Sequence, residues 1–443
     1  MTLNVRSFYL AAFILGIVLP GSAQAQEIPR PSLSRAREEA PNFSRPYNLK
    51  IGPISFAASA GLGIEFNDNI NYTKANKESD LILTPSLGIS GVWQVTKLNS
   101  LNLRTTLSYT KYLEHSELDS QSTLISPDSE IRLNLYVGDF KIVLHEQFSF
   151  QEDPITDGSV NGVARLGRFT NTIGGSVLWD GNDVTLLLGY DHLNYISTGN
   201  AANTNGSSNN DLSTLDHSND QISLAGTLKL TPTTRIGVEG TAAIATYPNN
   251  PLNGYSTFTL GPYLDVQLTR YTRITFGVGY QWFVPDESEG PAPPPDIFAA
   301  QNASQSNPQN EDGGGFYFHL AFDHRLNRAY QDRLAIGREI QIGLLSERTE
   351  TTFIRYNSQW AVTRQLMLTT SLYYENVHQL PQSGSLAGLV PDYRRFGATF
   401  STSYQLTKKL VVSLSYQYTF KMSDAPELDY AQNRFALQFG YQF

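Results

Sequence analysis

Histidine, serine and carboxylate side chains are the residues of this chain that could do chemistry, but their spacing matches no catalytic motif. The histidines are scattered along the sequence, at His115, His145, His192, His217, His319, His324 and His378. None shows the close His/Glu or His/His spacing of a helical zinc site, so we expect no catalytic residue, no metal and no cofactor. A serine and a histidine can also meet through folding, so an enzyme stays an alternative.

Three oxygen-rich residues in a row, Asn67, Asp68 and Asn69, could bind a hard cation such as Ca²⁺. They lack the spacing of a known calcium loop. Asn and Asp also favour the turn that ends a strand, because their short side chains bond to the nearby backbone. We therefore predict a turn here.

Charged residues of both signs fall on the polar side of alternating segments. The candidates for lining a pore are Arg104, Arg132, His145, Asp191, Glu239, His319, Asp323, Glu339, Arg355, Arg395 and Arg434, and Glu375 has the same parity. Opposed charges at a constriction select solutes by charge and hydration. The alternative is that these groups only pair with one another in a wet interior.

The elements that would position these charges are strands. A period of two, apolar on one face and polar on the other, recurs from Gly52 onward. The alternating segments are 53–66, 80–94, 99–114, 128–137, 139–151, 166–180, 182–197, 215–231, 233–247, 255–269, 271–284, 314–325, 330–345, 350–362, 364–378, 392–406, 408–421 and 430–443. We predict an all-β fold over 53–443, a transmembrane antiparallel up-and-down barrel of about eighteen strands.

The links between strands alternate between tight and long. Gly138-Asp139 and Asn327-Arg328 are tight, whereas 198–214 and 285–313 are long. Short turns on one rim and long loops on the other are typical of the outer membrane, with both termini on the periplasmic side. The acidic loop 285–313 either folds into the mouth and narrows the pore or is a mobile solvated loop.

Two residues break the alternation. Glu146 and Arg338 fall on the side predicted to face lipid, which indicates a bulge, a rim position or a shifted register. A soluble sandwich also alternates, but it needs turns every 8–12 residues, and these segments are longer.

Composition agrees with a barrel and excludes other classes. The hydrophobic fraction is 40%, which gives no reason to expect membrane helices, and a barrel needs only its outward residues apolar. A net charge of −9 argues against nucleic-acid binding. Cysteine is absent, which excludes disulfides and thiolate metal sites.

Residues 1–25 predict a signal peptide. Arg6 precedes an apolar run over 8–19, and Ala23-Gln24-Ala25 is a cleavage pattern. A membrane anchor is the alternative, but the run falls short of the roughly 20 residues that a span needs. Residues 26–52 are rich in proline and basic residues and lack a strand pattern. We predict a periplasmic N-terminal extension there, either a disordered linker or a small plug.

The last strand alternates aromatic and polar residues up to the final position, with Phe435, Phe439, Tyr441 and Phe443 on one face. It resembles the last strand of bacterial outer-membrane barrels. The resemblance implies localisation in the cell outer membrane, contact with its lipid, and insertion by the outer-membrane assembly machinery.

A second resemblance lies in the first strand and its loop. Gly61-Leu62-Gly63-Ile64-Glu65-Phe66-Asn67-Asp68-Asn69-Ile70, with Asn48-Leu49-Lys50-Ile51-Gly52-Pro53 upstream, is similar to a family of β-barrel porins. Members of that family resemble barrels encoded beside envelope or exopolysaccharide genes. The resemblance implies an outer-membrane channel and adds a hint of a polysaccharide partner.

The sequence therefore predicts a porin-like channel for passive passage of hydrophilic solutes or a polysaccharide. The alternative is a plugged structural or surface-presenting barrel linked to exopolysaccharide or envelope assembly. A TonB-dependent transporter is set aside, because residues 26–52 are too few for its folded plug. Monomer and trimer both stay open.

Overall fold

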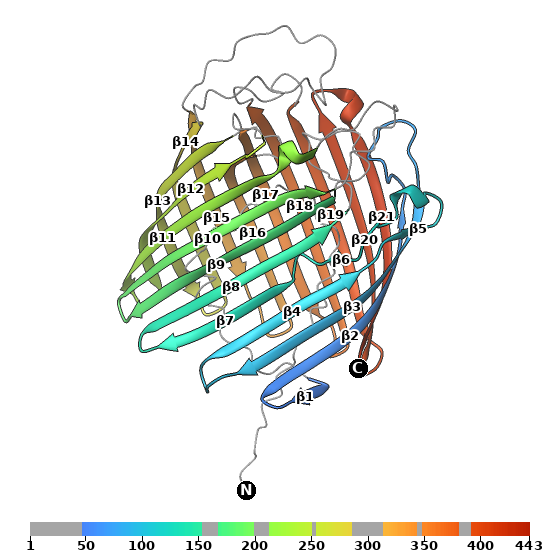
Figure 1. Ribbon diagram of the computed structural model, residues 1–443. Coiled ribbons are helices and arrows are strands. Elements are labelled where there is room, and N and C mark those ends of the chain that lie inside the picture. Colours follow the sequence, from blue (N-terminus) through green and yellow to red (C-terminus); the bar gives the residue numbers. More distant parts are fainter. Residues whose placement is uncertain are drawn as a thin grey trace.

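The computed structural model describes residues 47–152, 167–198, 212–249, 254–285, 313–342, 348–380 and 391–443. Their strands form one antiparallel sheet that closes into a barrel of eighteen long strands (Figure 1). These are β2 (Ile54–Asn67), β3 (Asp80–Gln94), β4 (Ser100–Ser108), β7 (Glu130–Val137), β8 (Phe140–Gln151), β9 (Gly167–Gly181), β10 (Val184–Thr198), β11 (His217–Thr231), β12 (Thr234–Thr246), β13 (Tyr255–Thr269), β14 (Thr272–Pro285), β15 (Gly313–His324), β16 (Tyr330–Ile342), β17 (Arg348–Ala361), β18 (Leu366–Leu380), β19 (Tyr393–Gln405), β20 (Leu410–Ser423) and β21 (Tyr430–Gln442). The predicted all-β barrel is confirmed.

Short elements complete the described chain. They are the strands β1 (Leu49–Ile51), β5 (Lys111–Tyr112) and β6 (Leu124–Ile125), and the 3₁₀ turns η1 (Ser116–Leu118), η2 (Leu212–Leu215) and η4 (Pro426–Leu428). Within the described ranges, no helix has the length and apolar character to cross a membrane. The predicted signal peptide and most of the predicted extension lie outside the described residues, as does nearly all of the loop 285–313.

The two faces of the wall differ as the alternation predicts. In β20, Leu414 is 54% exposed, whereas Ser413 and Ser415 on either side are 6% and 4% exposed. Because successive side chains of a strand point to opposite faces, the exposed apolar residues form the outer surface and the polar residues line the interior. An apolar exterior on a closed barrel is a lipid-facing surface.

The barrel closes where its first long strand meets its last one. β2 pairs with β21 from Ser59 opposite Gln442 to Asn67 opposite Arg434. The two strands lie side by side in Figure 1, in blue and red. Closure satisfies the backbone groups that an open sheet edge would leave unpaired in lipid.

No strand was predicted within residues 26–52, but the structure has a short strand, β1, near the end of this segment. β1 pairs with the start of β2, with Leu49 opposite Phe56 and Ile51 opposite Ile54. Gly52 has a φ of +59°, which lets the chain reverse within two residues, and Asn48 bonds through its side chain to both backbone groups of Ala58. β1 therefore occupies the edge of β2 that β21 leaves open.

The predicted strand 99–114 is interrupted. β4 ends at Ser108, and the chain re-pairs with β3 only at β5. The break lies opposite Pro85 of β3, whose carbonyl accepts the Tyr109 N–H at 3.2 Å but which has no N–H of its own to donate back to the ladder. After β5, the carboxylate of Asp80 accepts the backbone N–H groups of Leu113, Glu114 and His115 at 2.9–3.2 Å and holds this segment at the end of β3.

The hairpin of β16 and β17 leaves the wall at its outer end. Pairing between β15 and β16 stops at Phe318 opposite Arg338. Farther along, Ile340 is only 1% exposed although alternation assigns it to the outer face, and a Cβ built on Gly315 would contact its side chain. Gly315 has inward parity, so the hairpin leans over the lumen. This explains Arg338, which pairs there with Glu350 and not with lipid.

Candidate functional site: the charged inner wall and the mouth

Four charged side chains form a continuous ladder along the inner wall. Glu339 on β16 accepts a hydrogen bond from Arg355 on β17 at 3.0 Å, and Arg355 donates to Glu375 on β18 at 3.1 Å. Glu375 also accepts one from Arg395 on β19 at 2.6 Å. Acid and base thus alternate over four neighbouring strands. We call these four residues the inner charge ladder.

The ladder differs in exposure along its length. The side chains of Glu339 and Arg355 are 26% and 31% exposed, whereas those of Glu375 and Arg395 are 5% and 4% exposed. The first two can meet a passing ion, while the last two are held under neighbouring groups. Each arginine also lies over an aromatic ring: the guanidinium carbon of Arg355 is 4.0 Å from the centre of the Phe353 ring, and that of Arg395 is 5.6 Å from the centre of the Tyr373 ring.

The other predicted charges pair on other parts of the wall. His145 contacts Asp191 at 2.9 Å, and Arg333 contacts Asp323 at 3.2 Å. Three further contacts join Glu239 to His319, Arg132 to Glu130 and the Arg104 guanidinium to the Asp128 carbonyl. The structure thus brings Glu339, Arg355 and Arg395 into one ladder with Glu375 and places the remaining candidates in separate contacts. Whether they line a conducting pore stays a prediction.

Arg434, the last predicted candidate, lies at the seam of the barrel. Its guanidinium donates two hydrogen bonds, each 2.7 Å long, to the two carboxylate oxygens of Glu65. Both side chains are largely buried, at 6% and 15% exposure. The bidentate pair joins β21 to β2, so its charges are matched at the point where the barrel closes.

The sequence reasoning missed several partners of these charges. Glu65 has inward parity in its strand and could have been found by the rule that identified Arg434. Asp265 and Arg273 form another two-bond pair, at 2.8 and 2.7 Å, close to a periplasmic turn. No local signal reveals that pair before the register of β13 and β14 is known.

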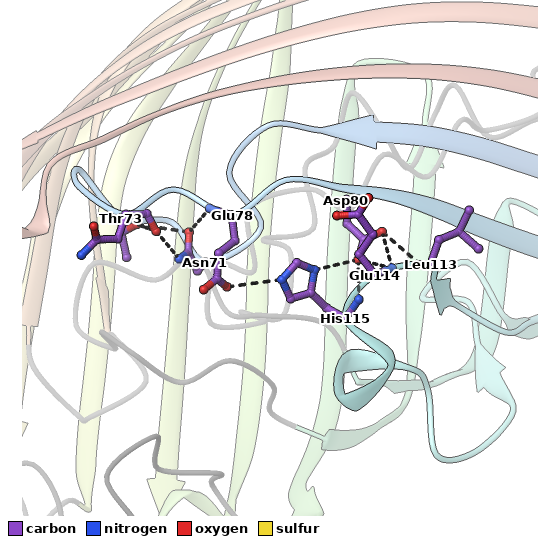
Figure 2. Close-up of polar contacts among 8 residues, drawn as sticks. Asn71, Thr73, Glu78, Asp80, Leu113, Glu114 and His115 are labelled. Atoms are coloured by element: carbon purple, nitrogen blue, oxygen red, sulfur yellow. Dashed lines mark hydrogen bonds and ion pairs between the residues drawn. The ribbon is translucent and has the colours of Figure 1, made fainter.

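The mouth contains a second polar network, between the segment that follows β2 and the turn η1 (Figure 2). The His115 ring lies between two carboxylates, 2.9 Å from Asp80 and 3.8 Å from Glu78. Asn71 accepts hydrogen bonds from the Glu78 backbone and the Thr73 hydroxyl, which fixes the neighbouring loop. Two mouth segments are therefore joined through one imidazole.

Charge pairing at the mouth shifts the pKa values of several groups, among them His115 and Asp119. The hydrogen bond to Asp80 raises the pKa of His115, and the nearby charges of Asp80 and Glu78 add to the effect. Burial raises the pKa of Asp119, but the hydrogen bonds from Lys111 and from the Tyr112 backbone outweigh it, so this pKa is lowered. Both shifts favour the charged forms near neutral pH.

The turn predicted at Asn67, Asp68 and Asn69 is confirmed. Asn67 accepts the backbone N–H of Asn69 at 3.0 Å, and Asp68 accepts both the backbone N–H and the side-chain amide of Asn433 at 2.6 Å. Asn69 is fully buried and donates to carbonyls of its own loop and of β21. The three residues therefore hold the loop against the last strand. Across the described ranges, no group of three or more His, Asp or Glu side chains is placed to hold a metal ion.

The histidines contact acids and one carbonyl. His115, His145, His192, His319, His324 and His378 lie beside carboxylates, and His217 contacts the Leu215 carbonyl. These contacts are of the kind that neutralise and orient a histidine in a polar wall.

The closed sheet, its apolar outer surface and its charged inner wall define the class: a transmembrane β-barrel of the outer membrane, built like a porin. No protein-family model matches the chain, and no curated protein matches it. Among solved structures, it is similar to OccK9 (OpdG) of Pseudomonas aeruginosa, with a TM-score of 0.45 at 10% identity over 88% of this chain and 98% of that one. It is also similar to a BenF-like porin from Pseudomonas fluorescens Pf-5, with a TM-score of 0.45 at 10% identity over 88% and 99% of the two chains.

Proposed function

We propose that the protein is an outer-membrane channel through which hydrophilic solutes pass passively, selected by size and by charge. The observation that carries the proposal is the inner charge ladder on the polar face of a closed barrel. Ion pairs that bridge neighbouring strands of a wet wall create a transverse field, which acts on any charged solute that crosses it.

The roles of the ladder residues follow from their exposure. Glu375 and Arg395 are buried and anchor the ladder. Glu339 and Arg355 share one of its ion pairs but retain solvent contact, so they act on the solute. The mechanism needs no cofactor and no conformational cycle.

The purified protein in a planar lipid bilayer tests the channel directly. We expect discrete, ohmic conductance steps in potassium chloride, because a water-filled lumen conducts small ions. A membrane that contains the folded barrel and shows no steps above background would contradict the channel.

The second candidate is the plugged structural or surface-presenting barrel. One observation favours it: Glu375, Arg395 and Lys421 of the inner wall are only 4%, 4% and 2% exposed, so little water reaches the wall at their level. Deletion of 26–46 or of 286–312 distinguishes the two. A plugged barrel gains conductance from one of these deletions, whereas an open channel conducts before either is made.

We also propose that outer-membrane lipid and the assembly machinery are its partners during insertion, and that a polysaccharide strand is a candidate solute. A polysaccharide added to one side of the bilayer should interrupt the ionic current in a voltage-dependent manner if it threads the lumen. A current that is unchanged by long and short oligosaccharides alike would restrict the channel to small solutes.

A further inference from the structure

Glu146 is an ionisable residue on the outer wall, at a depth where lipid is expected. Glu146 on β8 is directly opposite Ile131 of β7 and Ile173 of β9, and these two isoleucines are 39% and 51% exposed on the lipid side. Its strand pairs on both edges through this region, so Glu146, unlike Arg338, is not carried inward by a departing hairpin. It follows the start of β8 by about six residues, roughly 15 Å up an apolar band about 25 Å tall.

Glu146 belongs to a polar group that spans four strands, on the wall nearest the viewer in Figure 1. Asn171 on β9 donates to it at 2.9 Å. On the next two strands, Asp220 accepts hydrogen bonds from the Tyr190 hydroxyl at 2.6 Å and from the His192 ring at 2.8 Å. We call Glu146, Asn171, Tyr190, His192 and Asp220 the outer polar patch.

The outer wall beside the patch contains glycines. Gly175, Gly226 and Gly240 lie on the outer face of β9, β11 and β12, where an added Cβ would approach the outward side chains of Leu144, Leu186 and Leu260. The outer face from β14 to β21 instead carries large exposed rings, among them Phe276, Phe316, Phe400 and Phe435. Small residues let two membrane proteins approach closely, and large rings suit lipid chains.

We propose that the outer polar patch is a self-association surface, covered in the membrane by a second copy of this chain. Copies of one barrel insert in the same direction and to the same depth, so carboxylates and donors at matching heights meet across the contact. The patch contains both kinds of group: Glu146 and Asp220 accept hydrogen bonds, and Asn171 and His192 donate them. Two carboxylates make it a poor site for anionic lipid headgroups. The proposal is independent of whether the lumen conducts.

Single-cysteine variants test the contact, because the chain has no cysteine of its own. Ile173→Cys and Asn194→Cys each place a thiol beside the patch, and Thr402→Cys places one on the outer face of β19 as the control. Outer membranes that contain each folded variant are treated with a bifunctional maleimide. We expect a product of twice the chain mass from the first two variants and little from the control.

Charge removal gives an independent readout. Glu146→Leu should convert the oligomer seen by light scattering in mild detergent to a monomer, while Glu146→Gln, which still accepts from Asn171, should leave it associated. Strand content from circular dichroism verifies folding of both. Equal cross-linking of all three cysteine variants, a cross-linked product whose mass identifies a different protein, or a Glu146→Leu variant that stays oligomeric would each overturn the proposal.

Discussion

At the residue scale, the barrel depends on charges that are matched across strands. The side chains of Arg434 and Glu65 are largely buried, and the guanidinium donates one hydrogen bond to each carboxylate oxygen. Loss of one partner leaves a buried charge without compensation, which costs more than the pair itself contributes.

We therefore expect Arg434→Met or Glu65→Gln alone to lower the free energy of unfolding by about 3 kcal/mol. The double variant should recover much of that loss, because no unpaired charge remains. Urea unfolding of the refolded barrel in lipid vesicles, analysed as a double-mutant cycle, measures the loss in each single variant and the recovery in the double variant. Additive single losses would show that the pair does not act as a unit.

His115 gives a pH dependence at the mouth. Its pKa in the folded protein is raised above the ordinary value of 6.5 by its bond to Asp80. Because the pKa is raised, protonated His115 contributes its full stabilisation of the folded mouth below pH 6.5. This stabilisation is lost as the pH rises through the raised pKa.

Hydrogen exchange of the Leu113, Glu114 and His115 amides, corrected for intrinsic rates, should therefore show protection that falls as the pH rises above 6.5. The matched variant His115→Gln should show protection that does not change over the same range. Wild-type protection that is equally flat would contradict a role for the imidazole charge.

At the element scale, the wall was largely predictable and its exceptions were not. A two-residue period is a local property, so β3 and β13 begin and end at the residues that the alternation gave. The break after Ser108 depends on Pro85 in the neighbouring strand, and the lean of the β16–β17 hairpin depends on its contact with Gly315, so both depend on residues outside the affected strands. Parity placed the members of the inner charge ladder on one face, but which charges meet depends on a register that one sequence does not reveal.

β1 is a small element whose attachment can be isolated. Asn48→Ala removes the two side-chain bonds to Ala58, and Gly52→Val places a β-branched residue at a positive φ. Each should raise the exchange rate of the Leu49–Ile51 amides and leave the melting temperature of the barrel unchanged. Lys50→Ala, which alters an exposed side chain, is the control. A barrel that melts earlier in the first two variants would show that β1 supports the whole wall.

At the scale of the whole molecule, the inner charge ladder predicts how ion selectivity changes. Measured by the reversal potential in a salt gradient, Arg355→Gln should make the channel more selective for cations, and Glu339→Gln should make it more selective for anions. Each variant removes one partly exposed charge from the wall. Arg394→Gln changes a charge on the outer face of β19 and should have no effect. Shifts of the same sign in both ladder variants would contradict selection by these charges.

The seam has a consequence for how such a molecule comes into being. The bonds between Glu65 and Arg434 connect residues 369 positions apart, and the hydrogen bond from the Asn69 side chain to the Ala431 carbonyl of β21 connects residues 362 positions apart. Neighbouring hairpins can pair as soon as they exist, but these contacts form only after the final strand arrives. Until then the sheet has two edges with unpaired backbone groups, and each edge can pair with a strand of another chain. Damage to the seam should therefore reduce the yield of finished barrels before it weakens those that do close.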